Sequence, residues 1–320
     1  MKYRNLTNDI LVSEVGYGTW GLGGKAYGHT DDDASVNLLK YSFDKGINFF
    51  DTADLYGRSE SIVSKAFSGN RDKVVIATKG GTLPHSGFVM PQDFSGKYIE
   101  KALNKSLKVL GTDYIDLYQL HSPLINDLSD ELFLTLEKFK SSGKVREIGV
   151  STKSPEDAMN LIKKYNIKFL QVNYNMIDQR AKDIGLLDMA SHNNVSIICR
   201  TPLVFGYLTG SMSGGEKLED GDHRKNWPKD QLRMWADSTA LFDKINNGKK
   251  RSQVQTALQF CLEHDSIKTV IPGMMKKSEI IENISIFDVE ALSVDEFNKI
   301  CNIYNSNTFY DNKAKSRGIQ

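Results

Sequence analysis

Four residue types that can take part in proton transfer lie at or just after β-rich segments of the chain. Asp51 and Lys79 each end such a segment, His121 follows a third, and Tyr56 lies five positions after Asp51. A tyrosine hydroxyl has a reference pKa of about 10, and a lysine ammonium about 4 Å away would favour the phenolate by roughly 4 kcal/mol. A carboxylate would keep that lysine charged, and a histidine could hydrogen-bond the same substrate oxygen. This set indicates proton transfer to or from a carbonyl or alcohol oxygen.

Each of these residues also has a plainer interpretation when it is taken alone. Asp51 could cap the next helix, and Lys79, which precedes two glycines, could be a solvated loop residue. Tyr56 could serve packing, and His121 could be a loop histidine. All four plainer interpretations are disfavoured if one fold directs the four side chains to the same place. The set contains no nucleophile–base pair and no metal-ligand cluster, so it still requires a source of hydride.

The elements that would position these residues alternate along the whole chain. The predicted strands are 15–20, 47–51, 74–79, 115–119, 145–150, 169–173, 196–200 and 269–271. The predicted helices are 31–45, 59–67, 96–110, 129–142, 154–165, 180–193, 251–263 and 277–287. Eight Val- and Ile-rich strands, each followed by a helix, indicate a parallel sheet. A doubly wound sheet is one alternative, but a closed (β/α)8 TIM barrel needs this number and collects its chemistry at the carboxyl ends of the strands.

The organisation of the chain favours one α/β barrel domain over residues 1–320. No Pro/Gly/Ser-rich linker divides it, and each βα unit takes about 30 to 40 residues, as expected for such a barrel. The connection 207–250, after the seventh strand, is long enough to be a functional loop with structure of its own. A tail follows the last βα unit, with a predicted helix over 294–304.

Composition excludes several classes of function. The formal net charge is +1, and charged residues make up 25% of the chain without a basic cluster, which argues against nucleic-acid and membrane-surface partners. No apolar run approaches the roughly 18 to 20 residues that cross a bilayer, and the first residues do not form a signal sequence. Cys199, Cys261 and Cys301 lie far apart and predict reduced core thiols. We therefore expect a cytoplasmic protein without a metal site.

The segment GYGTWG, residues 16–21, fits the G-x-G-x-x-G pattern of a dinucleotide-binding Rossmann fold. That fingerprint requires a helix to open at the last glycine, so that its N-terminus can meet the pyrophosphate. The residues that follow, LGGKAYG, contain three more glycines and no helical period. The Rossmann interpretation is therefore disfavoured.

The chain as a whole resembles the aldo-keto reductases. The similar segments are VGYGTWGLGG, GINFFDTADLYGRSE, VVIATKGG, DYIDLYQLHSP, GKVREIGVST, FLQVNYNMID, RTPLVFGYLTG and IPGMMKKSEIIENI. They occur in family order over about residues 10–290, and FDTADLYGRSE is close to a family signature. The resemblance implies a (β/α)8 barrel that binds NADPH, or less often NADH, in an extended conformation across the barrel mouth. It also implies that GYGTWG is the first barrel strand with its loop.

The resemblance assigns roles to the four residues. Tyr56 would be the general acid in reduction, with its pKa lowered by Lys79. Asp51 would support Lys79, and His121 would orient the substrate carbonyl. The substrate pocket would be lined by Trp20, Tyr56 and His121.

The resemblance also implies cofactor contacts from the first strand to the last barrel helix. These are Gly18, Thr19, Trp20, Asp51, Ser151, Gln171, Arg200, Thr201, Pro202, Leu203, Gly206, Gly273, Lys276, Lys277, Glu282 and Asn283. Ser151 and Gln171 would hydrogen-bond the carboxamide. Arg200 stands where many members stack a tyrosine on the nicotinamide, and a guanidinium plane can stack as well. The segment Asp222-His223-Arg224 resembles a D-x-R element, which could be a cofactor clamp or a solvated loop with an internal ion pair.

The adenosine end departs from the family pattern. Met275 stands where similar chains place a basic residue, with Lys276 and Lys277 following it, and Glu279 replaces a later Arg or Gln. A helix N-terminus with two lysines can hold a phosphate, but a carboxylate opposes it. We favour NADP(H), with NAD(H) as the alternative.

These features predict an NAD(P)H-dependent oxidoreductase that reduces an aldehyde or ketone, sugars and keto-sugars included, to the alcohol. One alternative is an NAD(P)-dependent sugar or aldose dehydrogenase that works in the oxidative direction. A more remote alternative is a cofactor-binding regulatory subunit like the potassium-channel β subunits. The expected partner is a small carbonyl or alcohol substrate, and a homo-oligomer is left open.

Overall fold

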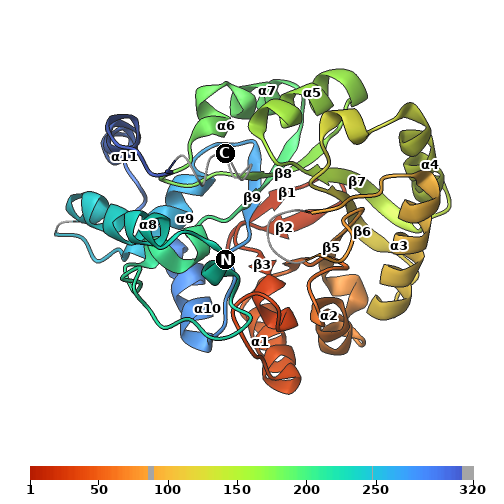
Figure 1. Cartoon of the computed structure of the whole chain (residues 1–320), viewed down its shortest axis with the longest axis horizontal. Helices are drawn as coiled ribbons and strands as arrows, with labels where there is room; N and C mark the ends of the chain where they lie inside the picture. Colours follow the sequence, from red (N-terminus) through yellow and green to blue (C-terminus); the bar gives the residue numbers. More distant parts are fainter. Residues whose placement is uncertain (86–89, 247, 312–320) are drawn as a thin grey trace.

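The computed structural model describes residues 1–85, 90–246 and 248–311. Its centre is a sheet of eight parallel strands that neighbour one another in chain order (Figure 1). The strands are β3 (Tyr17–Gly18), β4 (Phe49–Asp51), β5 (Val75–Gly80), β6 (Ile115–His121), β7 (Val145–Ser151), β8 (Phe169–Asn173), β9 (Ser196–Arg200) and β10 (Ile267–Val270). Bridges from Val15 to Val270 and from Gly18 to Gly273 join the first strand to the last. The sheet therefore closes, which confirms the predicted (β/α)8 barrel over the doubly wound alternative.

The helices form a ring outside the barrel (Figure 1). They are α1 (Asp32–Asp44), α2 (Ser59–Phe67), α3 (Gly96–Leu110), α4 (Asp130–Ser141), α5 (Pro155–Tyr165), α6 (Arg180–Asp183), α7 (Leu186–His192), α9 (Gln253–Leu262) and α10 (Lys277–Ile284). The helix predicted over 180–193 is divided, because Gly185 adopts the left-handed conformation with a φ of 78° between α6 and α7. The start of α5 is as predicted: the Ser154 side chain accepts a hydrogen bond from the Asp157 amide, and Pro155 takes the first helical position.

A two-stranded hairpin that the sequence did not predict covers the amino-terminal end of the barrel. Its strands, β1 (Tyr3–Asn5) and β2 (Leu11–Ser13), have three residues each, too few to show a strand period. Leu6, Ile10 and Val12 pack with the barrel-lining side chains of Phe49, Val75, Ala77, Leu117, Phe169, Ile198 and Ile271. The hairpin thereby closes the end of the barrel opposite the carboxyl ends of the strands.

The long connection after β9 contains α8 (Lys229–Phe242), and the tail helix is α11 (Val294–Ser306). Trp235 of α8 is completely buried, so this connection is packed rather than solvated. The buried Gln231 amide donates to the Phe309 carbonyl at 2.8 Å, and its side-chain oxygen accepts from the Asp311 amide at 2.8 Å. The tail thus holds α8 against the barrel.

Candidate active site

The carboxyl ends of β4, β5 and β6 bring together the four residues that were predicted for proton transfer. The Lys79 Nζ lies 2.6 Å from Asp51 Oδ2 and 3.3 Å from Tyr56 Oη, and it also donates to the Thr52 carbonyl at 2.9 Å. The His121 and Tyr56 rings meet edge to face, with 5.8 Å between their centroids. Asp51 and Lys79 are buried, whereas Tyr56 and His121 are only half-buried and can reach a substrate. The predicted grouping of these side chains is therefore confirmed.

Lys79 carries its charge in this buried position. Burial alone would lower the pKa of Lys79, but the opposite charges available on Asp51 and Tyr56 outweigh it, and the net pKa is raised. A permanently protonated lysine thus lies beside the Tyr56 hydroxyl. His121 behaves in the opposite way, because burial, with the positive charges of Lys79 and Arg200, lowers its pKa well below the ordinary value. Its imidazole is neutral at pH 7.

The predicted fall in the pKa of Tyr56 is wrong as a net effect. Burial raises the pKa of Tyr56 and outweighs Lys79, which lowers it as expected; Asp51 raises it further. The expectation from charge alone left out the desolvation of the phenolate. Tyr56 is therefore fully protonated at neutral pH, and Lys79 limits the rise rather than reversing it.

A network of amides holds the Asp51 carboxylate. The Gln171 Nε2 donates to Asp51 Oδ1 at 2.7 Å, and the Gln119 Nε2 donates to the same oxygen at 3.3 Å. Ser151 Oγ donates to Gln171 Oε1 at 3.3 Å. Ser151 and Gln171 were predicted as cofactor contacts, and the structure connects both to the carboxylate. Gln119 was missed, although its position two residues before His121 on a strand points it to the same side of the sheet.

Aromatic side chains from two loops form a wall beside Tyr56. The Trp20 ring lies 6.1 Å from Tyr56 and 4.4 Å from His223, and His223 also contacts Tyr27 at 5.1 Å and Phe205 at 4.8 Å between centroids. Burial lowers the pKa of His223 to about 4, so its ring is neutral. Sequence reasoning placed Trp20 here but missed Phe205 and His223. The signal for His223 was its place inside the D-x-R element.

That element fixes the long loop across the barrel mouth. Asp222 and Arg224 form an ion pair, with 2.6 Å between Oδ2 and Nη2, and Asp222 is 4% exposed. The His223 amide donates to the Ala26 carbonyl at 2.7 Å, and Asp222 bridges to Tyr27. The loop after β9 is thus attached to the loop after β3. The plainer interpretation is right about the internal ion pair and wrong about solvation, because the aspartate is buried and the segment is held on both sides.

The first strand and the segment after β9 supply further predicted positions. Thr19 is completely buried and its hydroxyl donates to the Asp51 carbonyl at 2.8 Å, which places it behind the site rather than on its surface. Pro202 and Leu203 lie in the turn after β9, where Thr201, Val204 and Phe205 have φ of 57°, 48° and 56°. Left-handed backbone at non-glycine residues costs of order 1 kcal/mol or more each and is concentrated at functional sites. Gly206, with a φ of 96°, completes this strained turn.

The predicted adenosine end lies at the start of α10. Lys276 and Lys277 are both exposed, and the Lys277 Nζ lies 5.0 Å from the centre of the Tyr41 ring. The Glu279 carboxylate accepts a hydrogen bond from the Met275 amide at 2.6 Å. It thereby takes up a backbone donor of the kind that an anion would use. Glu282, on the same helix, accepts from Ser252 Oγ at 2.7 Å.

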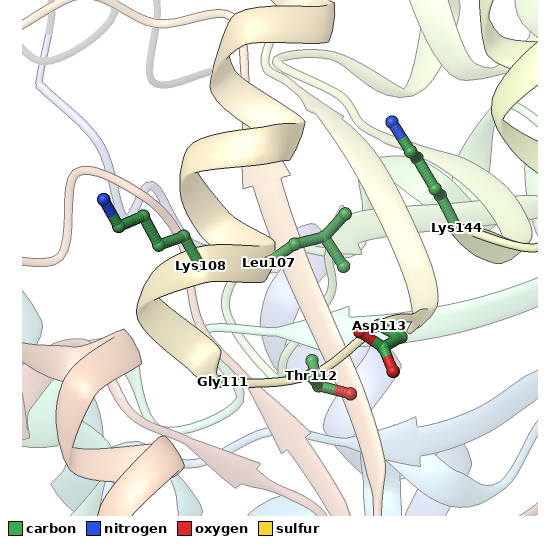
Figure 2. A pocket seen from close by; sticks show the side chains of 6 residues that line it. All are labelled: Leu107, Lys108, Gly111, Thr112, Asp113 and Lys144. Carbon is green, nitrogen blue, oxygen red and sulfur yellow. The ribbon is translucent and has the colours of Figure 1, made fainter.

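A surface cleft lies at the other end of the strands. Figure 2 shows its lining, Leu107, Lys108, Gly111, Thr112, Asp113 and Lys144, where α3 ends and the chain enters β6. His121, at the carboxyl end of β6, is therefore separated from this cleft by the length of the strand.

In the part of the chain that the structure describes, no group of His, Cys, Asp and Glu has a metal-binding arrangement. No described helix combines the length and apolarity that would let it cross a membrane.

Comparison with known proteins agrees with this geometry. The model of the Aldo/keto reductase family matches residues 14–305. The chain belongs to the aldo/keto reductase family. An uncharacterized oxidoreductase of Bacillus subtilis, YqkF, is 32% identical over 308 residues. The aligned residues cover 92% of this chain and 94% of the YqkF chain. The NADP(+) aldo-keto reductase yakc of Schizosaccharomyces pombe is 29% identical, covering 93% and 91%. The glycerol dehydrogenase AKR11B4 of Gluconobacter oxydans superposes with a TM-score of 0.79 at 27% identity, covering 95% and 94%.

Buried polar atoms at the mouth fit the nicotinamide cofactor that aldo/keto reductases use. Among the described residues, the atoms without a hydrogen-bond partner include His121 Nδ1, Thr152 Oγ1, Asn173 Oδ1, Arg200 Nε and Asn283 Nδ2. Buried polar groups are normally satisfied, so a ligand that supplies partners to these atoms fits the mouth. The first four come from the ends of β6 to β9, and the last comes from α10. An extended dinucleotide with polar groups at both ends matches this distribution.

Proposed function

We propose that this aldo/keto reductase reduces an aldehyde or ketone to the alcohol, with Tyr56 as the general acid. The observation that carries the proposal is the position of the Lys79 ammonium, 2.6 Å from Asp51 and 3.3 Å from the Tyr56 hydroxyl. The bound nicotinamide supplies the hydride, and every other part of the reaction is assigned to residues of this chain.

The proton step follows from the raised pKa values. Tyr56 holds its proton at neutral pH, as an acid must before it donates, and the phenolate that forms is stabilised by Lys79. Neutral His121 can hydrogen-bond the carbonyl oxygen. Because its ring carries no positive charge, it does not compete with Lys79 as the partner of the phenolate. Asp51, held by two glutamine amides, keeps the lysine in place. The protonated Tyr56 is the form that reduction uses, whereas oxidation requires Tyr56 to be ionised first.

Lys276 and Lys277 support NADP(H) as the preferred cofactor. Both are exposed at the start of α10, where they can face a 2′-phosphate. The Glu279 carboxylate, bound to the Met275 amide, is the feature that favours NAD(H). A relative described as an NADP(+) enzyme agrees with the first choice. Fluorescence titration with NADPH and with NADH distinguishes the two cofactors. Much tighter binding of NADPH supports the role of the lysines in binding the 2′-phosphate. Equal or tighter binding of NADH assigns the cofactor specificity to Glu279.

The proposed substrate is a small carbonyl compound that carries hydroxyl groups, such as an aldose or keto-sugar. A solved relative is described as a glycerol dehydrogenase, which acts on a polyol. Neutral His223 and Trp20 supply a hydrogen-bonding group and an apolar face beside Tyr56. The test is NADPH oxidation at 340 nm with glyceraldehyde and with propanal, against the Tyr56→Phe variant as a blank. Turnover of neither aldehyde would contradict the proposal, and faster oxidation of glycerol than reduction of glyceraldehyde would favour the dehydrogenase alternative.

A further inference from the structure

The two oxygens of the Asp51 carboxylate have different partners. Oδ2 lies 2.6 Å from Lys79 Nζ, whereas Oδ1 accepts from Gln171 Nε2 at 2.7 Å and from Gln119 Nε2 at 3.3 Å. Gln171 Nε2 also lies 3.4 Å from Gln119 Oε1, and Gln171 Oε1 accepts from Ser151 Oγ at 3.3 Å. The carboxylate therefore joins the lysine of the proton step to a buried row of amides that extends to β8 and β7.

The direction of these hydrogen bonds follows from the chemistry of the ion pair. An ionised carboxylate only accepts hydrogen bonds, and a lysine ammonium only donates them. Both glutamines must therefore turn their NH2 groups toward Asp51. The two amide hydrogens of Gln171 are taken by Asp51 and Gln119, so its oxygen is left to face Ser151. All four of these side chains are buried, and water offers them no alternative partner.

Gln171 and Ser151 lie in the same layer of the barrel mouth as His121. The strand register pairs His121 with Ser151 and Ser151 with Gln171 at the carboxyl ends of β6, β7 and β8. Among the described residues, only Ser151 uses one of the two lone pairs of Gln171 Oε1. Since Ser151 gives its one hydroxyl hydrogen to Gln171, both side chains offer lone pairs to a ligand. Two acceptors side by side fit a group with N–H bonds, such as the NH2 of a nicotinamide carboxamide.

We propose that Asp51 is a positioning residue for the cofactor as well as for Lys79. Its carboxylate fixes the direction of the amide row, so that the oxygen of Gln171, and not its NH2 group, receives the carboxamide. This inference rests on the proposed function, since it takes the nicotinamide cofactor of that reaction as the ligand.

The Asp51→Asn substitution reverses the direction of the row. At pH 6 Lys79 remains protonated, because the Thr52 carbonyl and the Tyr56 hydroxyl still accept from it. An ammonium only donates, so the asparagine oxygen must face Lys79 and its NH2 group takes the place of Oδ1. Gln171 then has to turn its oxygen inward, and it presents its NH2 group to the mouth.

The test compares the binding of NADP+ with that of its 3-acetylpyridine analogue, in which a methyl group replaces the carboxamide NH2. Calorimetric titration at pH 6 gives the ratio of the two dissociation constants. Both compounds carry the same charge, so the ratio is insensitive to the lost charge of Asp51. We expect the wild type to bind the analogue about tenfold more weakly, the size of one unmade hydrogen bond to a buried acceptor. In Asp51→Asn the ratio should fall to about one to two, because the amide and ketone oxygens accept equally from an NH2 group.

Two further variants complete the comparison. Gln171→Leu removes the acceptor and keeps the Asp51 charge, so its ratio should also fall to about one to two, and it decides the question if Asp51→Asn does not fold. Gln259→Met is the control. Gln259 is a half-buried residue of α9 whose amide donates to the Ile286 carbonyl at 2.9 Å, and its ratio should stay near tenfold.

The outcomes separate this inference from the proposed function. A ratio near one in the wild type, or a ratio that stays near tenfold in Asp51→Asn or in Gln171→Leu, would overturn the role of Asp51 in orienting the amide row. A purely structural role of Asp51 would weaken the binding of both compounds by the same factor and leave the ratio unchanged. A wild-type protein that shows the tenfold ratio but reduces no carbonyl compound would overturn the proposed function alone.

Discussion

Replacing Lys79 by methionine should separate the structural use of the buried ion pair from its catalytic use. The Lys79 and Asp51 side chains are 0% and 3% exposed, so Lys79→Met leaves a carboxylate buried without its cation. Breaking a buried pair in this way costs about 3–5 kcal/mol of the free energy of unfolding. Asp51 Oδ1 keeps its two glutamine donors, and only Oδ2 loses its 2.6 Å partner. We therefore expect a loss near the lower limit, about 3 kcal/mol.

The double variant Asp51→Asn/Lys79→Met removes the uncompensated charge. The asparagine side chain is neutral, and its oxygen can still accept from Gln119 and Gln171, so most of the lost stability should return. Catalysis should not return, because no ammonium remains to stabilise the Tyr56 phenolate. The assays are urea unfolding at pH 7 and kcat for aldehyde reduction. The reasoning is refuted if Lys79→Met is as stable as the wild type, or if the double variant recovers activity together with stability.

Two further predictions concern Asp54 and the adenosine end. Burial, followed by the charge of Glu60, raises the pKa of Asp54 from 3.8 to about 7. The protonated carboxyl therefore stabilises the folded chain below pH 3.8, and this contribution to the free energy of unfolding is lost as pH rises through 7. About three pKa units correspond to ~4 kcal/mol, and the free energy of unfolding of Asp54→Asn relative to the wild type should rise by up to that amount between pH 4 and 8. The exposed Asp44→Asn substitution is the control, and a pH-independent difference for Asp54→Asn would contradict the prediction. Lys276→Ala should weaken NADPH binding about tenfold and leave NADH binding unchanged, whereas Lys101→Ala should change neither; equal loss of both cofactors would contradict a 2′-phosphate role.

The barrel was predictable because each strand and helix carries its own local signal. The eight strands were found in order, since Val- and Ile-rich segments alternate with amphipathic ones over the whole chain. The amino-terminal hairpin was missed because three-residue strands have no measurable period, and its apolar residues act only by packing on the barrel end. The division at Gly185 also went unpredicted, because a single glycine inside a helical pattern is often tolerated.

The proton-transfer residues were predictable because barrel strands end at one mouth. Their pKa values were not, since the rise for Tyr56 depends on burial that only the folded chain creates. The same holds for Asp54, which has the sequence pattern of an ordinary loop acid within FDTADLYGRSE. Contacts between distant loops, such as His223 on Trp20, depend on how the long connection folds back, and no local pattern encodes that.

Single-turnover hydride transfer in the Tyr56→Phe variant tests the assignment of the acid most directly. The variant keeps the ring beside Trp20 and His121 and removes only the hydroxyl next to Lys79. Stopped-flow mixing of the cofactor-loaded protein with an aldehyde measures the chemical step, and fluorescence titration measures cofactor binding. We predict a fall of several orders of magnitude in the rate of hydride transfer, with a cofactor dissociation constant within about twofold of the wild type. A variant that kept most of its rate would show that another group donates the proton.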